Sequence, residues 1–480
     1  MTDHQRKTSR IAIIGAGMAG LSCCRELLSH GFKNITIFEA RDRIGGRIAD
    51  SSALGKPVDL GPNWLHGDSP SNSLQEYYHK PGVTLHDIGE QNAIYTRDGR
   101  LLNTYERENI EGKMWEYVDR AISYSSLHSE IIDEKLGLLD FVEHEMDRDC
   151  VYDERQREQI RDAMVMFGFY IGEAATRQSL KFAYLEEMVP GETLFVASGY
   201  TGILNAVAEP ALQSSWVKVK LASPVAIVRT VKGRVEISLE ENRENEDVER
   251  FDWVVVAVPL GVLKGAEKKG GIKFEPEMPA GMKEAIKCLG YGRLEKVYIK
   301  FERAFWGDVD QIEFFSPEYT TQHWPMSALS LSQLPAAQAQ NTLLFYTYGE
   351  ISAFICGLED EKVISFFEEY YSRLAGYDAS IDVPVAIVRT SWSTDARAGK
   401  GSYVYAPAGI SNAREDLHRL RQGMADRHVL FAGEHCADEL QIGTVGGAFA
   451  SGIQAAVKLA STELDGDDGG GGATTDTITS

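Results

Sequence analysis

Cysteine is scarce in this chain: there are six cysteines among 480 residues, and no two of them form a C-x-x-C pair. A disulfide framework is therefore not expected, and we predict no metal site. Basic residues are also few, because 49 Lys and Arg stand against 71 Asp and Glu, which gives a formal net charge of −22. Phosphate groups would be repelled along their approach to such a chain, so we expect no nucleic-acid partner.

Long apolar runs are lacking too. The longest, 253–263 (interrupted by Pro259) and 11–24, fall short of the roughly 20 residues that a membrane span needs. The basic residues before the second run resemble the start of a secretory signal, but its glycines fit a different structure, described next. We therefore expect an intracellular protein without a membrane span. The chain ends in Thr-Ile-Thr-Ser rather than a Ser-Lys-Leu address, so cytoplasmic is the expected location and peroxisomal the alternative.

A strand, a glycine turn, a helix and a second strand are predicted at the start of the chain. Residues 10–14 (RIAII) are β-rich, and the glycine run GAGMAG follows them at once. The next segment, LSCCRELLSHG, has the apolar spacing of a helix that ends at Gly31. Residues 34–39 (NITIFE) then form the second strand, which ends on an acid.

In this context the glycine run is a dinucleotide-binding fingerprint. Gly15 permits the tight turn, Gly17 lets a pyrophosphate approach the backbone, and Gly20 lets helix and strand pack closely. Free N–H groups at the start of the helix would meet the phosphates. Glu39, nineteen residues after Gly20, would accept hydrogen bonds from a ribose diol.

Similar strand-and-helix patterns recur in the segments FDWVVVAVPLGVL and HVLFAGEH…GTVGGAFASGIQAAVKLA. The expected fold is α/β (α+β overall), with a Rossmann-like nucleotide-binding domain assembled from discontinuous segments and an inserted substrate domain of mixed sheet and helices. The expected boundaries are 1–90, 211–290 and 396–464 for the first domain, 91–210 and 291–395 for the second, and 465–480 for a disordered tail.

Directly after Glu39 the chain reads ARDRIGGR, ending at Arg47. The whole run GAGMAGL…FEARDRIGGR resembles the flavin-dependent amine oxidases, the superfamily of monoamine oxidases, polyamine oxidases and lysine-specific histone demethylases. Two glycines and a guanidinium at this place would reach a pyrophosphate that one helix dipole cannot neutralise. The resemblance implies FAD as the cofactor.

The resemblance covers about residues 10–460 and is greatest to the polyamine oxidases. It rests also on DLGPNWLHG, GYGRLEKVYIKF, SWSTDARAGKGSYVYAPAG and FAGEH…GTVGGAFASG. The FAD contacts that it implies are Gly15, Gly17, Gly20, Glu39, Arg41, Arg47, Gly61, Val225, Trp392, Glu434, Thr444 and Val445.

Four catalytic residues are implied by the same resemblance. Lys296 matches the family lysine that holds a water near flavin N5 and assists flavin oxidation by O₂. Tyr403 matches the aromatic residue that stacks in the substrate tunnel. His66 falls where several polyamine oxidases have an active-site histidine, and a structural role is its alternative. Glu173 aligns with a carboxylate that faces the amine in some polyamine oxidases, and a solvated helix acid is its alternative.

Three positions depart from the family pattern. Ser402 stands where monoamine oxidases attach FAD through a cysteine, so non-covalent FAD is expected. The second aromatic residue of the substrate cage is replaced by Gln441 or Ile442, and a common histidine is replaced by Gly446. Losing that aromatic wall weakens cation–π recognition, so the substrate need not be a standard polyamine. Histone demethylases carry additional helical segments that have no counterpart here, and we do not expect that activity.

The expected function is an FAD-dependent amine oxidase, with a polyamine as the first-choice substrate. In this family a carbon next to nitrogen gives a hydride to the flavin and O₂ is the acceptor, which yields an aldehyde, a smaller amine and H₂O₂. The alternatives are an oxidase of an L-amino acid, a monoamine or a secondary-metabolite amine, and a non-catalytic flavin-binding interaction protein. The oligomeric state is not predicted.

Overall fold

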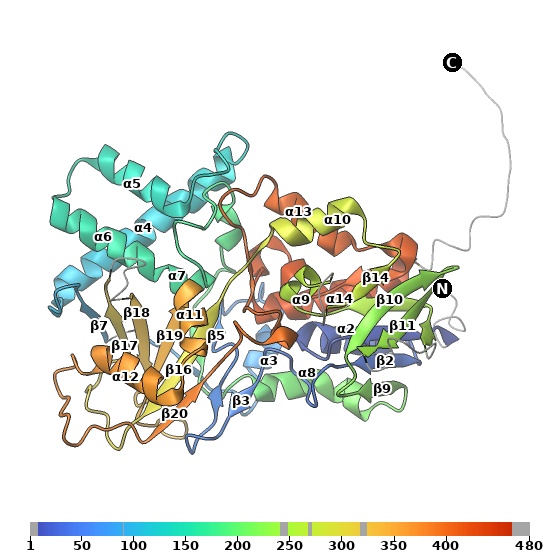
Figure 1. Ribbon diagram of the computed structural model, residues 1–480, viewed down its shortest axis with the longest axis horizontal. Helices are drawn as coiled ribbons and strands as arrows, with labels where there is room; N and C mark the ends of the chain where they lie inside the picture. Colours follow the sequence, from blue (N-terminus) through green and yellow to red (C-terminus); the bar gives the residue numbers. More distant parts are fainter. Residues whose placement is uncertain (1–7, 90, 241–247, 267–270, 317–323, 463–480) are drawn as a thin grey trace.

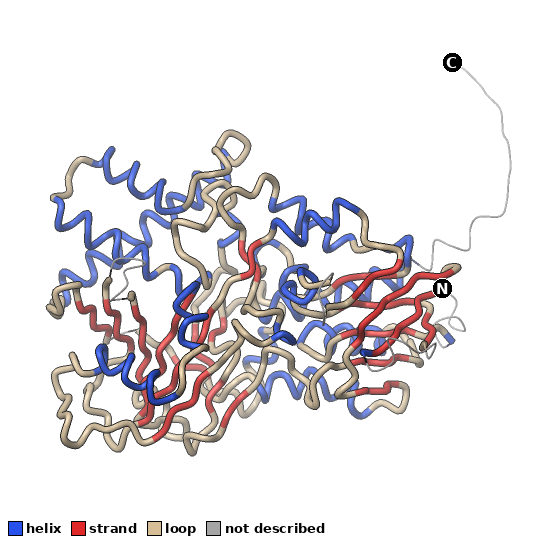
Figure 2. Tube along the Cα trace, viewed as in Figure 1, coloured by secondary structure: helices blue, strands red, loops and turns tan. Residues whose placement is uncertain are grey.

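The computed structural model describes residues 8–89, 91–240, 248–266, 271–316 and 324–462. The expected disordered tail at 465–480 and most of the acidic run near 241–250 lie outside these residues. The described chain is elongated, with the two large sheets toward opposite ends of the molecule (Figure 1). Between them the chain is mainly loop (Figure 2).

The first large sheet is parallel, with strand order β22-β13-β1-β2-β9. Its strands come from five separated segments: β1 (Ile11–Ile14), β2 (Ile35–Phe38), β9 (Val217–Lys220), β13 (Trp253–Val256) and β22 (Val429–Phe431). All residues of β1, β2, β13 and β22 are buried, as in parallel sheets covered on both faces. The predicted mixed α/β architecture with a parallel sheet is confirmed.

Helices α2 (Met18–Ser29), α8 (Thr201–Gln213) and α14 (Val445–Thr462) cover one face of this sheet. Helix α2 starts three residues before the predicted Leu21, because Gly17 is extended and serves as its N-cap. Helix α14 packs closely on α2, since Gly452 has no side chain and a Cβ there would overlap the Ala19 carbonyl.

The other face of the parallel sheet packs against a four-stranded sheet and several helices. The sheet order is β12-β11-β10-β14. The elements are β10 (Val225–Val231), β11 (Arg234–Leu239), β12 (Glu249–Phe251), β14 (Lys273–Glu275), α9 (Leu260–Lys264), α10 (Ala280–Cys288) and α13 (Ala413–Gln422).

The second large sheet has the order β20-β16-β19-β18-β17-β7, with every pair antiparallel except β7–β17. Its strands are β7 (Asn92–Tyr95), β16 (Leu294–Lys300), β17 (Gln311–Phe314), β18 (Met326–Ser330), β19 (Thr342–Tyr348) and β20 (Ala386–Arg389). The predicted strand segments KVYIKF, TLLFYTY and PVAIVRT fall on β16, β19 and β20.

Helices cover the second large sheet on both sides. One face packs against α11 (Gly349–Cys356) and α12 (Asp360–Tyr371). On the other side lies a helical group, drawn at the upper left of Figure 1: α4 (Thr104–His128), α5 (Leu138–Asp149), α6 (Glu154–Met166) and α7 (Gly168–Ile171). This group has its own core, which includes Tyr117, Val142 and Met164.

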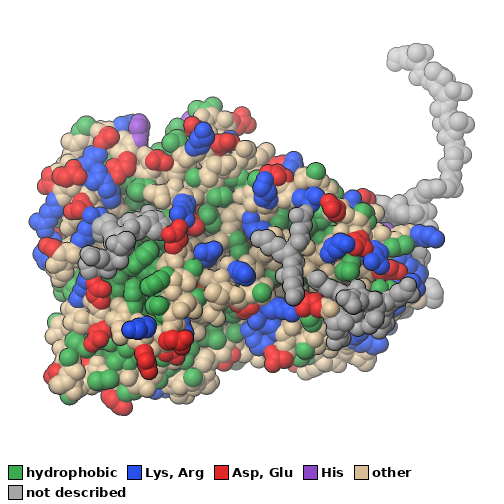
Figure 3. Space-filling model, viewed as in Figure 1, with side chains coloured by type: hydrophobic (Ala, Val, Ile, Leu, Met, Phe, Trp, Pro, Cys, Tyr) green, Lys and Arg blue, Asp and Glu red, His purple; other side chains and the backbone are tan. Residues whose placement is uncertain are grey.

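Short elements connect these layers. They are β3 (Asp50–Ser51), β4 (Val58–Asp59), β5 (Trp64–Leu65), α3 (Gln75–Tyr78), β6 (Leu85–His86), η1 (Ala183–Glu186), β8 (Leu194–Val196), β15 (Gly290–Tyr291), η3 (Ala396–Ala398), β21 (Val404–Tyr405), η4 (Ala425–Arg427), η5 (Glu434–Cys436) and η6 (Glu439–Gln441). On the face shown in Figure 3, acidic and basic side chains are interspersed. The net negative charge therefore produces no single acidic field on that face.

Candidate active site

A cavity of about 780 Å³ begins at the carboxyl ends of β1 and β2. It extends to the second large sheet, on the face of that sheet nearer to α4 and α7. It begins at the carboxyl ends of parallel strands, which is where open α/β sheets bind their ligands. All the predicted cofactor residues except Gly20 line this cavity. Gly20 lies inside α2, where a Cβ would overlap the Gly15 carbonyl, so its role in this structure is close packing behind the turn.

The glycine turn and the acid after β2 are held together. Gly15 has a φ of +108°, and a Cβ there would lie 2.6 Å from the Ala257 carbonyl oxygen. The buried Glu39 carboxylate accepts hydrogen bonds from Ala16 N at 2.8 Å and Arg41 N at 2.9 Å. Each carboxylate oxygen keeps a lone pair for another donor, which suits the hydroxyls of a ribose.

Two arginines of the cavity wall are oriented by acids. Arg41 pairs with Asp395 at 2.7 Å, and Arg47 pairs with Glu434 at 3.0 Å and also donates to the Ser402 carbonyl. Burial alone would raise the pKa of Glu434, but Arg47 reverses the direction and the pKa lies below its ordinary value. Both guanidinium groups keep N–H donors beyond these pairs.

The first residues of α2 and α14 also reach the cavity. Thr444 caps α14, because its Oγ1 accepts a hydrogen bond from Gly447 N at 3.0 Å. Helix N-termini and arginines attract anions, and glycines without side chains let phosphate approach the backbone. These residues therefore fit the pyrophosphate and ribose of FAD.

At the other end of the cavity, Lys296 projects from β16 and is 4% exposed. Its Nζ donates to the backbone carbonyls of Gly61 and Asp59, the latter at 3.3 Å. Burial lowers the pKa of Lys296 to about 7, while the Asp59 carboxylate acts in the opposite direction. Burial thus favours the neutral form of this lysine.

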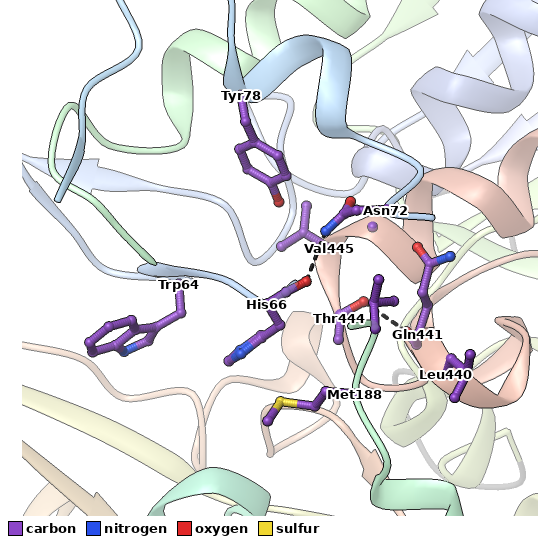
Figure 4. Close-up of a pocket in the computed structure, with 11 residues that line it drawn as sticks. Trp64, His66, Asn72, Tyr78, Met188, Leu440, Gln441, Thr444 and Val445 are labelled. Atoms are coloured by element: carbon purple, nitrogen blue, oxygen red, sulfur yellow. Dashed lines mark hydrogen bonds between the residues drawn. The ribbon is translucent and has the colours of Figure 1, made fainter. Parts of the chain in front are cut away.

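Tyr403 and His66 line the cavity with Lys296. The Tyr403 hydroxyl donates to the Tyr170 carbonyl at 3.0 Å, and burial followed by the nearby Glu186 raises its pKa. Burial lowers the pKa of His66 to about 4, so its imidazole is neutral at pH 7. In Figure 4 the Asn72 amide donates to the His66 backbone carbonyl at 2.9 Å. The His66 Nδ1 has no hydrogen-bond partner among the described residues.

Glu173 is not brought to this site. It does not line the cavity, and its carboxylate instead accepts a hydrogen bond from the Tyr405 hydroxyl at 3.4 Å and lies 3.8 Å from Arg177. Of the four predicted catalytic residues, the structure therefore groups Lys296, His66 and Tyr403.

Four other carboxyl groups, those of Asp119, Glu186, Glu187 and Glu313, line the cavity and were not predicted from the sequence. Burial raises the pKa of Glu186 to about 7. Burial, with a further contribution from Glu111, raises the pKa of Glu313 to about 8. In β17, Gln311 and Glu313 alternate with the buried Ile312 and Phe314. That alternation is the sequence signal that could have placed Glu313 on an open face.

The positions that depart from the family pattern, 402, 441, 442 and 446, differ in whether they line the large cavity. Ile442, not Gln441, lines the large cavity. Gln441 turns toward Ser73, whose hydroxyl donates to its Oε1 at 2.9 Å, and a Cβ at Gly446 would lie 2.9 Å from the same oxygen. The Ser402 hydroxyl bonds to the backbone of Leu294. No cysteine lines the cavity within the described part of the chain.

Two features are absent from residues 8–89, 91–240, 248–266, 271–316 and 324–462. No helix there is long and apolar enough to cross a membrane. No group of three His, Cys, Asp or Glu residues there could hold a metal ion.

Sequence comparison with known proteins identifies the family of this chain. The family of flavin-containing amine oxidoreductases matches residues 18–460, and the chain belongs to it. The chain is 29% identical to polyamine oxidase 2 of Arabidopsis thaliana, over 94% of this chain and 88% of that protein. It is 27% identical to the corticosteroid-binding protein of Candida albicans, over 94% and 95%. It is 26% identical to the peroxisomal N(1)-acetyl-spermine/spermidine oxidase of Bos taurus, over 94% of each chain. The expected family is confirmed, and a flavin cofactor, an amine substrate and O₂ follow from it.

Proposed function

We propose that this protein is an FAD-dependent oxidase of linear polyamines or long diamines, with FAD bound non-covalently. The support is the family, the names of the polyamine and N(1)-acetyl-spermine/spermidine oxidases to which the chain is similar, and the charges of the cavity wall. The absence of cysteine from the described cavity wall favours non-covalent binding, since it removes the attachment used by monoamine oxidases.

The charges around the substrate end of the cavity carry this proposal. The basic residues that line the whole cavity in the described structure are Arg41, Arg47, Lys296 and Arg397. The three arginines pair with Asp395, Glu434 and Glu240 at the dinucleotide end. Beyond Lys296, the described wall offers the carboxyl groups Asp119, Glu186, Glu187 and Glu313, none with a recorded ion pair. Such a wall attracts ammonium groups.

The same observation weighs against an amino-acid substrate. A buried substrate carboxylate needs a cation or several donors to replace its water, and Arg is the usual partner. The arginines of the described wall are already paired at the other end, so a substrate carboxylate beside Glu186 or Glu313 would find no unpaired arginine there and, unlike an ammonium, would oppose the ionisation of these carboxyl groups. We therefore favour an amine without a carboxylate.

The reaction balances as follows. The substrate C–N unit loses two electrons and two protons, and water hydrolyses the resulting imine to an aldehyde and a smaller amine. O₂ takes up two electrons and two protons and becomes H₂O₂. FAD, when bound, supplies the two-electron acceptor. The reacting nitrogen must be neutral, since a protonated amine has no lone pair to support the developing cation.

The side chains of this site would serve that reaction by position and charge. Lys296 would orient a water beside the flavin and stabilise negative charge while O₂ is reduced. Tyr403 would shield the reacting carbon from solvent. Neutral His66 could accept a hydrogen bond through Nδ1 from the amine or from a water. Each of these roles is part of the proposal.

The experiment that tests the proposal mixes the yellow holoprotein with amines in the absence of O₂. Spermine, spermidine and long diamines should bleach the flavin, and readmission of air should restore the colour with one H₂O₂ per aldehyde formed. L-amino acids should leave it yellow. Bleaching by amino acids alone would refute the polyamine proposal, and no bleaching by any amine would favour a non-catalytic flavin protein.

A further inference from the structure

Four cavity-lining residues form one row across the second large sheet. Lys296 on β16 lies opposite Tyr346 on β19, Tyr346 lies opposite Ser327 on β18, and Ser327 lies opposite Glu313 on β17. Figure 1 shows these strands side by side in this order. Directly opposed residues in a sheet point to the same face, and all four residues line the same cavity. The row therefore runs along one wall, with a cation at one end and a carboxyl group at the other.

The length of this row follows from sheet geometry. Neighbouring strands lie about 4.8 Å apart, so three spacings separate Lys296 from Glu313 by about 14 Å. Contacts within the row agree with the register: Lys296 Nζ lies 5.8 Å from the centre of the Tyr346 ring. Gln311 Nε2 lies 3.5 Å from Ser327 Oγ and 3.1 Å from Glu313 Oε1. The central strands of a sheet are rigid, so the separation is fixed by the fold.

Glu313 differs from most carboxyl groups of this protein. It is half-buried, and the described structure records no Lys, Arg or His within ion-pair distance of it. Its recorded hydrogen bond comes from the Gln311 amide. Trp115, Phe167 and Tyr170 also line this part of the cavity. Because no cation of the described protein pairs with it, the ionised form of Glu313 would be stabilised most by a cation that enters with the ligand.

We infer that Glu313 binds the distal ammonium of the substrate and that the Lys296-to-Glu313 row selects the length of the amine. This inference rests on the proposed function, since it assumes that the carbon to be oxidised lies near Lys296. The ligand class is a linear aliphatic amine with a second cationic nitrogen and no carboxylate. Glu313 is a specificity-determining residue, and Glu186, which lies near Tyr403, contacts a nitrogen closer to the reacting carbon.

A preferred length can be worked out from the row. We take the reacting nitrogen to lie across the cavity from Lys296, at the same position along the row. Subtracting about 3 Å for the hydrogen bond to the Glu313 carboxylate then leaves about 11 Å between the reacting nitrogen and the distal nitrogen. An extended chain advances about 1.2 Å per bond, as three bonds span about 3.6 Å in an extended backbone. Nine bonds then separate the nitrogens, the length of 1,8-diaminooctane and of the two ends of spermidine.

The test is a profile of kcat/KM against chain length for α,ω-diamines from 1,4-diaminobutane to 1,12-diaminododecane. The wild-type profile should have a maximum near eight carbons. Octylamine, of the same length but with one nitrogen, should show a KM at least tenfold higher than the diamine, the factor expected for a lost hydrogen bond between charged groups.

Glu313→Gln should raise KM for the diamine about tenfold and remove the maximum, and it should change KM for octylamine much less than KM for the diamine. Glu313→Asp withdraws the carboxylate by one methylene, so the maximum should move one carbon longer. The double variant Q311E/E313Q keeps the charge but moves it two residues along β17, and it should not restore the wild-type profile. Flavin content and thermal melting identify any variant that fails to fold.

The outcomes separate the two proposals. A wild-type profile without a maximum, or an unchanged maximum in both Glu313 variants, overturns the inference while amine oxidation stands. Should no amine be oxidised by the wild type, the proposed function falls and the inference with it. A maximum that moves in Glu313→Asp and disappears in Glu313→Gln supports the inference, because a structural role of Glu313 would not change the preferred length.

Discussion

Binding of a dication to the substrate end of the cavity should release protons, because two wall carboxyl groups are partly protonated in the free protein. The pKa of Glu313 is about 8 and that of Glu186 about 7. At pH 7 Glu313 is then mostly protonated and Glu186 about half protonated, and a dication favours the ionised form of both groups. Binding should therefore release roughly one to two protons per site.

A suitable ligand is octane carrying a guanidinium group at each end, since a guanidinium stays charged over the whole range and is not a substrate amine. Calorimetry in two buffers with different ionisation enthalpies at pH 7 measures the protons released. The affinity should rise as the pH increases from 6 to about 9, because carboxyl groups that are already ionised lose no proton on binding, and it should level off at higher pH.

Glu313→Gln should reduce the release by roughly one proton and leave the contribution of Glu186. Octylguanidinium, with a single charge, is the matched ligand control and should release fewer protons than the dication. If the wild type releases no protons at pH 7, or if Glu313→Gln releases as many as the wild type, then these carboxyl groups do not bind the cations.

Three further predictions concern Lys296, its neighbour Asp59 and the predicted ribose-binding residue Glu39. Lys296→Met should retain FAD but slow turnover at least tenfold, a barrier increase of about 1.4 kcal/mol, measured by O₂ consumption; wild-type turnover would contradict the role of the lysine. Glu39→Ala should lose FAD during gel filtration, whereas Glu39→Gln keeps an acceptor for the Ala16 N–H and should retain more; equal occupancy in all three proteins would exclude the ribose contact. Asp59→Asn removes a carboxyl group whose charge raises the pKa of Lys296, so the variant should lower the pKa of Lys296. Competitive acylation of lysines against pH, read by mass spectrometry with Lys300 as the internal reference, measures that shift, and an unchanged midpoint would contradict it.

The dinucleotide end of the site could be predicted well from the sequence, because its chemistry is local. A short segment supplies the strand, the glycine turn, the helix and the acid, and their spacing alone places Glu39 beside the turn. The hydrogen bond from Ala16 N to the Glu39 carboxylate shows that the glycine turn and the acid are in direct contact. Arg47 follows a few residues later and was predicted with the same segment.

The substrate end was predicted less completely, because distant segments meet there. Glu173 was selected by alignment within its own segment, but its direction depends on Tyr405 and Arg177, with which its carboxylate interacts. Glu313 was missed because part of its environment is created by α4 and α7, which lie far from β17 in the sequence. The pairing register of a sheet, which aligns Glu313 with Lys296, could not be deduced from one sequence.

The separated origin of the parallel sheet has a consequence for how the protein acquires its cofactor. The strand β22 and the helix α14 complete a site that the first forty residues begin, and α14 packs directly on α2. During synthesis the N-terminal fingerprint therefore leaves the ribosome long before the cavity can close around a dinucleotide. Stable retention of FAD should come late, when Thr444 and Val445 have reached their places, and bound FAD would then hold the beginning and the end of the chain together.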